Sequence, residues 1–475
     1  MADVIKPDLC VIGAGALGIE LALHGRQRGL GVALVDVPGV DAVDPAQGAL
    51  RRAAFLASAA RAQAIRTAGA VGVDAPDPKP NFRVIGEHAA SVAASAEPRD
   101  ARERLVALGV TVLSGAAGFV DRRTLRCGDD LVRAGHFALA TGATPFIPPL
   151  PGLDQVPFFT ADTIEDNIRK LSHLVVIGGA PAALELAQAY RRLGSMVTLV
   201  PQGGLLQGFD PELVAVLLRT LREEGVVVRE DAEVTAILPR SQGTGVALQA
   251  AGSAETVDAS HILIAMGRVP VLDQELLDPL KLRRDRLRPD HLLLGPRGQT
   301  SNRRLSAIGG AAGQHQPTVA TRQADLLVEW LLGRGNGRLD PHYVPSIVMT
   351  QPVLAQVGME ARQALRPGQT VLRANLAETD GARAMGQAEG SVRLVVNRGG
   401  TISGAGALGA SADQTMALLA LAMARGLGLR DLAGLALPPG STAAALVDLA
   451  RHHLAQQPPP SGWRRRLRGA GNILP

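Results

Sequence analysis

Short apolar runs, a glycine turn and a helix-like segment follow one another at the start of the chain. Residues 8–12 contain a short apolar run, and a second apolar run, Val32–Val35, closes with Asp36. Between the two runs lie three closely spaced glycines, Gly13, Gly15 and Gly18, and then a helix-like stretch. Apolar runs of this length, bounded by glycine, are typical of buried strands. The pattern therefore predicts strand, turn, helix and strand, which is an α/β unit.

The three glycines and the acid together favour a dinucleotide-binding turn. Glycine permits a tight turn and lets a pyrophosphate approach the N-terminus of the next helix, where free N–H groups and the helix dipole attract anions. Asp36 stands where an acidic side chain can bind ribose hydroxyls. A glycine triplet alone is weak support, but the flanking strands and the acid make dinucleotide binding our prediction. The alternative is a glycine-rich turn that holds no ligand.

A second unit of the same kind begins at the apolar run Leu174–Ile177. It continues through Gly178 and Gly179 into a helix-like stretch and closes with Met196–Val200. Position 183 of the motif is an alanine, which is tolerated where close helix packing sets the requirement and positive φ does not. We predict a second nucleotide site here. The alternative is a doubly wound domain that keeps its fold and has lost its ligand.

Length and composition indicate a globular protein of several domains. The chain has 475 residues, and domains usually hold about 100–200 residues, so about three domains are expected. Hydrophobic residues make up 46% and charged residues 20%, which argues against extended disorder. We find no window with the roughly 20 apolar residues of a membrane span and no signal-peptide core. The expectation is a chain without a transmembrane span, in the cytoplasm.

Charge and cysteine content exclude several classes of site. The formal charge of +5 is spread over a long chain and aromatic residues make up only 3%, so nucleic acid is not an expected partner. The two cysteines, Cys10 and Cys127, exclude a disulfide framework and a cysteine-rich metal centre, and no metal is expected. Residues 456–475 contain three consecutive prolines and a short arginine-rich stretch. We expect this basic tail to be solvated, with weak contact to an anionic membrane surface as the alternative.

Several separate segments resemble the pyridine nucleotide-disulfide oxidoreductases, in particular dihydrolipoamide dehydrogenase and mercuric reductase. Besides the two glycine motifs, these segments are Ala140-Thr141-Gly142-Ala143-Thr144-Pro145, Ile264-Ala265-Met266-Gly267-Arg268-Val269-Pro270 and Ala307-Ile308-Gly309-Gly310. Further along the chain, Met349-Thr350-Gln351-Pro352 and Gly404-Ala405-Gly406 resemble the family's dimerisation domain. The segments also occur in the family's order.

The resemblance implies an α/β fold with two Rossmann-like domains, the second inserted in the first, and a C-terminal α/β dimerisation domain. On this basis the FAD domain comprises residues 1–155 and 270–340, the NAD(P) domain 156–269 and the dimerisation domain 341–455, before the tail. The implied cofactors are FAD and NAD(P)H, and the implied assembly is a homodimer. The residues that match cofactor-binding motifs of the family are Gly13, Gly15, Gly18, Asp36, Thr141, Gly142, Gly178, Gly179, Gly267, Arg268, Gly309 and Gly310.

The family's redox-active cysteine pair has no counterpart in this sequence. When the segment after Asp36 is aligned with the family without a gap, the two cysteine positions are Asp44 and Ala49. Neither aspartate nor alanine can carry two electrons as a thiol does. The family's C-terminal His and Glu should fall within residues 438–445, which contain no His and no acidic residue. We therefore expect no dithiol relay and no disulfide, lipoamide or mercuric reductase activity.

Two more departures concern the flavin site. The family aspartate that binds the ribityl and pyrophosphate region of FAD is Gly310 here, and losing one charged hydrogen bond costs about 1.5–3 kcal/mol. Glu185 matches a family glutamate whose lysine partner is Ala53 in this chain. Because an unpaired, partly buried carboxylate tends to have a raised pKa, Glu185 is the candidate catalytic proton donor or acceptor. The alternative is a glutamate that is simply solvated in an open cleft.

The leading hypothesis is an FAD-dependent oxidoreductase that passes electrons from NAD(P)H through flavin to a small acceptor such as a quinone or oxygen. The alternative is a non-catalytic nucleotide-binding dimer that serves as a sensor, scaffold or partner subunit. The second unit ends in Val200, Pro201 and Gln202. These residues offer neither an acid for a free 2′-hydroxyl nor an adjacent Arg for a 2′-phosphate, so both nicotinamides stay open.

Overall fold

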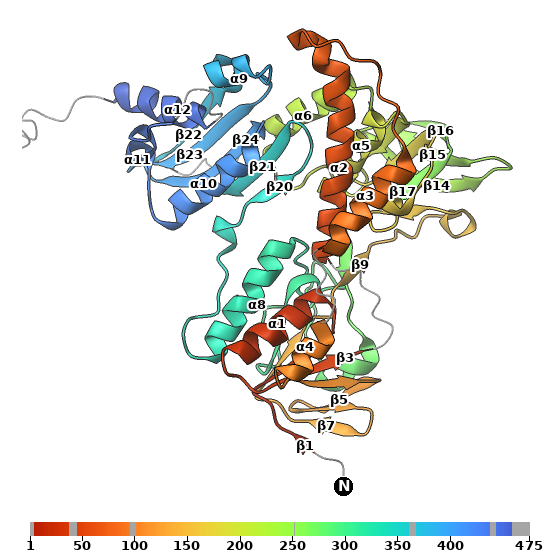
Figure 1. Cartoon of the computed structure of the whole chain (residues 1–475), viewed down its shortest axis with the longest axis vertical. Helices are drawn as coiled ribbons and strands as arrows, with labels where there is room; N and C mark the ends of the chain where they lie inside the picture. Colours follow the sequence, from red (N-terminus) through yellow and green to blue (C-terminus); the bar gives the residue numbers. More distant parts are fainter. Residues whose placement is uncertain are drawn as a thin grey trace, which may run out of the picture. The chain divides into compact units, whose positions relative to one another are not determined.

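The computed structural model shows two units of unequal size (Figure 1). The residues that the structure describes are 4–37, 45–95, 101–250, 252–360, 367–437 and 443–457. The first unit contains Met1–Gln207 and Leu221–Asp340, and the second contains Gly208–Thr220 and Pro341–Pro475. The basic tail therefore falls almost entirely outside the described residues, as do Asp44 and residues 438–442.

The first unit begins with a five-stranded parallel sheet in the order β19-β8-β2-β3-β4. Its strands are β2 (Leu9–Ile12), β3 (Val32–Asp36), β4 (Thr111–Ser114), β8 (His136–Leu139) and β19 (Leu305–Ala307). Alternate residues of a strand face opposite sides of a sheet. Leu9 and Val11 accordingly join the core made with α1 (Ala16–Gln27) and α8 (Pro317–Leu331).

The other face of this sheet packs against a second, smaller sheet. Cys10 and Ile12 lie in a core with residues of a four-stranded sheet in the order β1-β7-β6-β5. The strands of that sheet are β1 (Val4–Ile5), β5 (Ala117–Asp121), β6 (Thr124–Cys127) and β7 (Asp130–Val132). Both cysteines of the chain are therefore core residues of this layer.

A second five-stranded parallel sheet follows in the order β10-β17-β11-β12-β13. Its strands are β10 (Phe159–Thr160), β11 (His173–Ile177), β12 (Met196–Val200), β13 (Val227–Val228) and β17 (His261–Ile264). Helix α5 (Pro181–Arg192) packs on β11 and β12. A three-stranded antiparallel sheet shares a core with β11 and β17, and its strands are β14 (Ala232–Pro239), β15 (Thr244–Ala250) and β16 (Ser253–Ala259).

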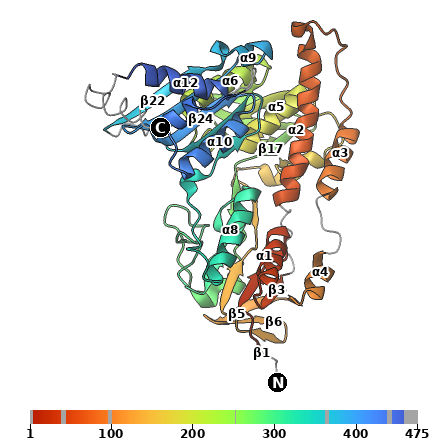
Figure 2. The same cartoon turned by 60° about the vertical axis from the view of Figure 1, so that its left-hand side comes forward.

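Helices α2 (Pro45–Thr67) and α3 (Phe82–Ser95) lie side by side in both views of the molecule (Figures 1 and 2). Tyr190 of α5 is fully buried between them. Its ring centroid lies 5.4 Å from that of Phe55 in α2 and 5.9 Å from that of Phe82 in α3. Aromatic pairs at this spacing add to the hydrophobic contact. The three rings therefore join α2 and α3 to the second sheet.

The second unit is built on a five-stranded antiparallel sheet in the order β20-β21-β24-β23-β22. Its strands are β20 (Ser346–Val348), β21 (Val353–Gly358), β22 (Gln369–Asn375), β23 (Ser391–Asn397) and β24 (Ile402–Gly409). Its core also includes residues of α10 (Ala412–Ala424), α11 (Leu429–Ala433) and α12 (Ala444–Ala455).

The segment Gly208–Thr220 belongs to this second unit by its contacts, although the expected boundaries place it within residues 156–269. The segment contains most of α6 (Pro211–Glu223). Asp210, directly before α6, accepts two hydrogen bonds of 3.0 Å from Nη1 of Arg393 in β23. Both side chains are at least nine-tenths buried. This ion pair fixes the start of α6 against the antiparallel sheet.

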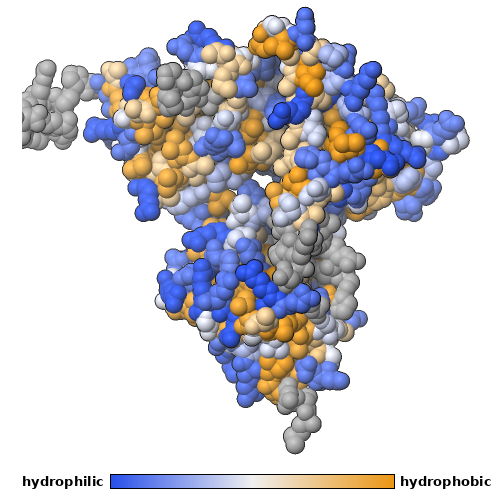
Figure 3. Space-filling model, in the orientation of Figure 1, coloured by the Kyte–Doolittle hydropathy of each residue, from blue (hydrophilic) through white to orange (hydrophobic). Residues whose placement is uncertain are grey.

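The expected α/β fold class, with two parallel five-stranded sheets and a C-terminal α/β unit, is confirmed. No helix within the described residues is long and apolar enough to cross a membrane. Hydrophilic and hydrophobic residues are interspersed over the face of the molecule shown in Figure 3.

Candidate functional site

The first glycine turn joins β2 to α1 and has one open side. Gly13 has a φ of +110°, and a Cβ there would lie 2.6 Å from the carbonyl oxygen of Ala140. A Cβ on Gly18 would lie 1.9 Å from the carbonyl oxygen of Gly13. A Cβ on Gly15, the N-cap of α1, would meet no described atom within 4 Å. Two of the glycines are thus required by close backbone contact, and the third leaves the helix N-terminus accessible to an anion.

The end of β3 brings Asp36 to the same edge of the sheet. The N–H of Gly13 donates a hydrogen bond of 2.9 Å to the carbonyl oxygen of Val35, the residue before Asp36. Carboxyl ends of parallel strands are where nucleotides bind in folds of this type. The open glycine turn and the half-buried acid therefore lie together, as the sequence predicts, and they fit the pyrophosphate and ribose of a dinucleotide.

Gly309 and Gly310 form a third part of this edge, in the 3-10 helix η5 (Gly309–Ala312). Both are buried, and Gly309 has a φ of +55°, a conformation that favours glycine. A Cβ on Gly310 would lie 2.6 Å from the carbonyl carbon of Gly142 and 2.7 Å from the nitrogen of Ala143. The expectation that Gly310 merely lacks a carboxylate is therefore incomplete: the backbone has closed on this position.

Thr141 and Gly142 lie opposite η5. Thr141 is buried, and its Oγ1 donates a hydrogen bond of 2.6 Å to the carbonyl oxygen of Val271. Gly142 has a φ of +76°, which favours glycine. These residues shape the backbone beside the first glycine turn, and the Thr141 hydroxyl is already engaged with the protein.

The second glycine turn joins β11 to α5 in a similar way. Gly178 has a φ of +138°, and a Cβ there would lie 2.1 Å from the carbonyl oxygen of Ala265. A Cβ on Gly179 would lie 2.2 Å from the carbonyl oxygen of Gly204. Ala183 is fully buried in α5, in agreement with a position where helix packing sets the requirement.

Gln202 stands two residues after β12 and follows Pro201, which occupies the position of Asp36 in the first unit. Its Oε1 accepts a hydrogen bond of 2.8 Å from the N–H of Val234 in β14. This side-chain oxygen is therefore engaged within the protein. The structure adds no charged residue at this position that would favour one nicotinamide nucleotide over the other.

Glu185 lies on α5, the helix that packs against α2. It is buried, with 8% of its surface exposed, and it does not lack an interaction partner. The expectation of an unpaired carboxylate is therefore wrong, and so is the alternative of a simply solvated one. On α2, Ala49 and Ala53 are both exposed. The paired position Asp44 lies outside the described residues.

Neither cysteine can serve as a surface nucleophile in this structure. Cys10 is fully buried in β2, and Cys127 is 3% exposed in β6. Both are free thiols. Burial raises the pKa of Cys10 far above its usual range, and burial, with Asp130 and Asp36 nearby, raises the pKa of Cys127. Since the thiolate is the reactive form, both side chains act as packing residues.

Gly267 and Arg268 follow β17 on the return to the first sheet. Gly267 has a φ of +100° and open space around its Cα. Arg268, expected to contact a cofactor, forms an ion pair with Asp162 and a hydrogen bond to the backbone of Ala143. Sequence reasoning missed this pair because Asp162 carries no recognisable motif.

Arg51 and Arg52 of α2 form two more ion pairs that the sequence did not predict. Nε of Arg52 donates a hydrogen bond of 2.9 Å to Glu165, which is 3% exposed. Arg51 pairs with Asp166, the last residue of the 3-10 helix η3 (Ile164–Asp166). Burial raises the pKa of Glu165, whereas Arg52 opposes that rise. These two ion pairs could not be recognised in the sequence, because each arginine lies more than 100 residues before its carboxylate partner.

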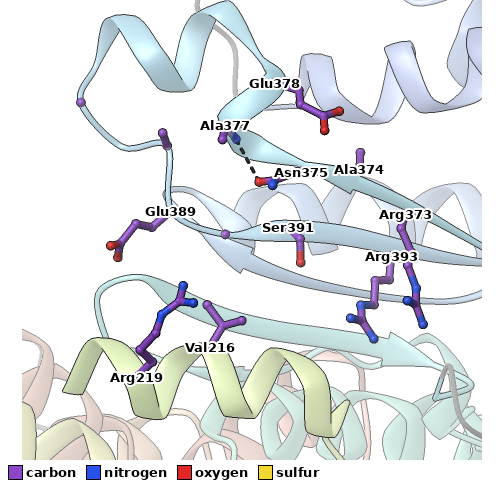
Figure 4. A pocket seen from close by; sticks show the side chains of 13 residues that line it. Val216, Arg219, Arg373, Ala374, Asn375, Ala377, Glu378, Glu389, Ser391 and Arg393 are labelled. Atoms are coloured by element: carbon purple, nitrogen blue, oxygen red, sulfur yellow. Dashed lines mark hydrogen bonds between the residues drawn. The ribbon is translucent and has the colours of Figure 1, made fainter. Parts of the chain in front are cut away.

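A cavity of about 780 Å³ lies in the second unit, between α6 and the strands β22 and β23 (Figure 4). Arg219, Arg373 and Arg393 line it together with Glu378 and Glu389. Arg373 and Arg393 both pair with Glu212, and Arg393 also binds Asp210. With positive and negative groups both present and the two strand arginines already paired, the lining does not define one class of ligand. No group of three or more potential metal ligands occurs within the described ranges.

Comparison with protein-family models matches residues 7–324 to the pyridine nucleotide-disulphide oxidoreductases and residues 344–445 to the dimerisation domain of that family. A mercuric reductase of Streptomyces lividans is 28% identical over 90% of this chain and 92% of its own length. A dihydrolipoyl dehydrogenase of Thermus scotoductus is 30% identical over 92% of this chain and 94% of its own length.

Solved structures show the same fold. LpdA from Mycobacterium tuberculosis superposes with a TM-score of 0.82 at 23% identity, covering 94% of this chain and 99% of that one. The HOCl-induced flavoprotein disulfide reductase RclA of Escherichia coli, as its Cu(II) complex, has a TM-score of 0.78 at 21% identity with the same coverage.

Proposed function

This chain belongs to the pyridine nucleotide-disulphide oxidoreductase family, whose members use FAD and NAD(P)H, and from that premise we propose that it is an NAD(P)H oxidoreductase without a dithiol relay. In this proposal electrons pass from the nicotinamide through FAD to a small acceptor that is not a disulfide, such as a quinone or oxygen. The family's dimerisation domain supports a homodimer as the working assembly.

One observation carries the proposal. A relay through sulfur needs a thiolate beside the flavin, and the chain has two cysteines. Both lie in the core between two sheets, and both have raised pKa values. An acceptor that takes electrons from the flavin itself needs no thiol. The position that matches the second family cysteine, Ala49, offers only a methyl group.

The residues of the first glycine turn fit FAD. Gly15 leaves the N-terminus of α1 open for the pyrophosphate, and Asp36 lies at the same sheet edge for the ribose. The second turn, at Gly178 and Gly179, would hold the nicotinamide nucleotide at the N-terminus of α5 in the same manner. Bound FAD would supply hydride acceptance and electron transfer. The protein's part is to bind and orient the two nucleotides.

The decisive experiment is FAD titration of the purified protein followed by anaerobic mixing with NADH and with NADPH. We expect FAD to bind and at least one nicotinamide to bleach its visible absorption. Steady-state assays with a benzoquinone or oxygen should then show turnover, whereas dihydrolipoamide, glutathione disulfide and mercuric ion should not be converted.

The double variant Cys10→Ala/Cys127→Ala is the control, and it should keep quinone turnover. Disulfide or mercuric turnover that this variant loses would refute the proposal. Absence of FAD binding at excess FAD, or bound FAD that neither nicotinamide reduces, would instead favour the non-catalytic nucleotide-binding dimer.

A further inference from the structure

The chain crosses between the two parallel sheets of the first unit along two short strands. It leaves the first sheet through β9 (Ala143–Pro145) and returns from the second through β18 (Arg268–Pro270). The two strands pair antiparallel, with Pro145 opposite Arg268 and Ala143 opposite Pro270. The chain therefore passes through this two-stranded sheet each time it crosses between the two parallel sheets.

Each crossing strand starts from a backbone contact with one glycine turn. Gly13 approaches Ala140 so closely that a Cβ would lie 2.6 Å from its carbonyl oxygen, and Gly178 approaches Ala265 in the same way at 2.1 Å. The N–H of Ala140 donates to Ile12, and that of Ala265 donates to Ile177, each at 2.8 Å. The pairing of β9 and β18 therefore joins two stretches of backbone that each contact one glycine turn.

Arg268 ties the two crossing strands to the second sheet. Its Nη1 donates to both carboxylate oxygens of Asp162, at 2.5 and 2.8 Å, and its Nη2 donates to the carbonyl oxygen of Ala143 at 2.6 Å. Asp162 follows β10, the edge strand of the second sheet. The Arg268 and Asp162 side chains are 23% and 14% exposed. A planar guanidinium that makes several charge-assisted hydrogen bonds with little exposure holds its partners in a defined geometry.

The turn that contains Asp162 is itself fixed from other sides. Arg52 of α2 donates to the carbonyl oxygen of Ala161 and to Glu165. The hydroxyl of Tyr190 in α5 donates to the carbonyl oxygen of Ile164 at 2.9 Å. Arg268 therefore binds to a segment that α2 and α5 already hold in place, which makes the segment a firm anchor for the crossing strands.

We infer that the Arg268–Asp162 ion pair is a positioning device that sets the distance and angle between the two nucleotide sites. The inference rests on the proposed function, because it concerns transfer between two bound nucleotides. Hydride transfer needs reacting atoms about 3–3.5 Å apart, and a misplacement of about 1 Å can cost roughly a hundredfold in rate. Arg268 acts through β9, β18 and Asp162, and it is a positioning residue, not a ligand of either cofactor.

The test compares Arg268→Gln, Asp162→Asn and Arg268→Lys with the intact protein. The control is Arg229→Gln, which breaks an exposed ion pair with Glu255 in the same unit. For the first two variants we expect the rate of flavin reduction at saturating NAD(P)H to fall about 10- to 100-fold. Dissociation constants for FAD and NAD(P)H should stay within about twofold, the Lys variant should recover part of the rate, and the control should not change.

Hydrogen exchange gives a second readout that does not depend on catalysis. The N–H of Phe146 donates to the carbonyl oxygen of Gly267, and that of Val271 donates to the carbonyl oxygen of Gly142. Exchange at both amides therefore reports on the stability of the pairing between β9 and β18. We expect faster exchange at both amides in Arg268→Gln and Asp162→Asn, and wild-type exchange in the control. If either variant fails to fold, the other and Arg268→Lys still provide the comparison.

Three results would overturn the inference. One is a tenfold or greater loss of FAD or NAD(P)H affinity in Arg268→Gln with normal reduction in Asp162→Asn, since that would make Arg268 a cofactor ligand. Another is unchanged reduction in both variants. The third is unchanged exchange at Phe146 and Val271. A wild-type protein that no nicotinamide reduces would refute the proposed function alone, and the exchange measurement would still decide the role of the ion pair.

Discussion

Restoring the family's aspartate at position 310 tests how far this flavin site has changed. On sequence alone, Gly310→Asp should regain a charged hydrogen bond and tighten FAD binding by about 1.5–3 kcal/mol. The structure predicts the opposite. A Cβ at this position would lie 2.6 Å from the carbonyl carbon of Gly142 and 2.7 Å from the nitrogen of Ala143. Both neighbours are backbone atoms, so neither can rotate away.

The expected cost follows from this contact. Even Gly310→Ala should lower the free energy of unfolding by about 1–3 kcal/mol, the usual range for overpacking. Gly310→Asp should cost more, because a buried carboxylate without a partner adds about 1–3 kcal/mol or more. A backbone shift at Gly142 would also disturb the edge where FAD is expected, so neither variant should bind FAD more tightly.

Urea unfolding of the apo protein, followed by circular dichroism, measures the stability of each variant, and FAD titration measures its affinity. Gly69→Ala is the control, since a Cβ there meets no described atom within 4 Å. It should leave the protein as stable or slightly more stable. A Gly310→Asp protein of unchanged stability that binds FAD more tightly than wild type would show that the reasoning is wrong.

Three other predictions follow from single features. Gly15→Val should fill the open side of the first turn and lower FAD affinity at least about 100-fold. The circular dichroism spectrum should stay that of the wild type, and unchanged FAD affinity would contradict the fit to FAD. Burial, with Arg297 and Arg304, lowers the pKa of His136 from 6.5 to about 4. The unfolded chain therefore binds a proton that the folded one does not, and the free energy of unfolding should fall by up to about 3 kcal/mol as the pH drops from 6.5 to 4. Urea titrations at several pH values should show a shallower fall in His136→Gln, and parallel curves would refute this assignment. Light scattering should give about twice the chain mass of 49.3 kDa, and a monomer mass at micromolar concentration would contradict the dimer.

The glycine turns could be predicted from the sequence because their cause is local. Gly13 and Gly178 have positive φ values and touch neighbouring backbone, and glycine is the residue type that tolerates both conditions. Alternation along β2 likewise follows from residue order, and it appears in the structure as two separate cores. The α/β units and the place of the first glycine turn therefore followed from short stretches of sequence.

The ion pairs could not be predicted, because their cause is distant. Arg52 and Glu165 are 113 residues apart, Arg268 and Asp162 are 106 apart, and Arg393 and Asp210 are 183 apart. An arginine in a sequence is most often a solvated surface residue. Only the folded backbone shows which carboxylate it meets. For the same reason, alanine at position 53, where the family has a lysine, did not reveal that Glu185 is buried and has another interaction partner.

Helix α2 is held in place by residues other than those at the positions that match the second family cysteine and the family lysine. Arg52, Phe55 and Ala59 recur at helical spacing and are half-buried or buried. Arg52 bonds to Glu165 of η3, and Phe55 packs against Tyr190. Ala49 and Ala53, one helical turn apart, are exposed. The anchoring contacts of α2 therefore use none of the positions that match the second family cysteine or the family lysine. Because the helix is held by other residues, alanine at positions 49 and 53 is compatible with its packing. The proposed transfer from flavin to a small acceptor needs no thiol on this helix.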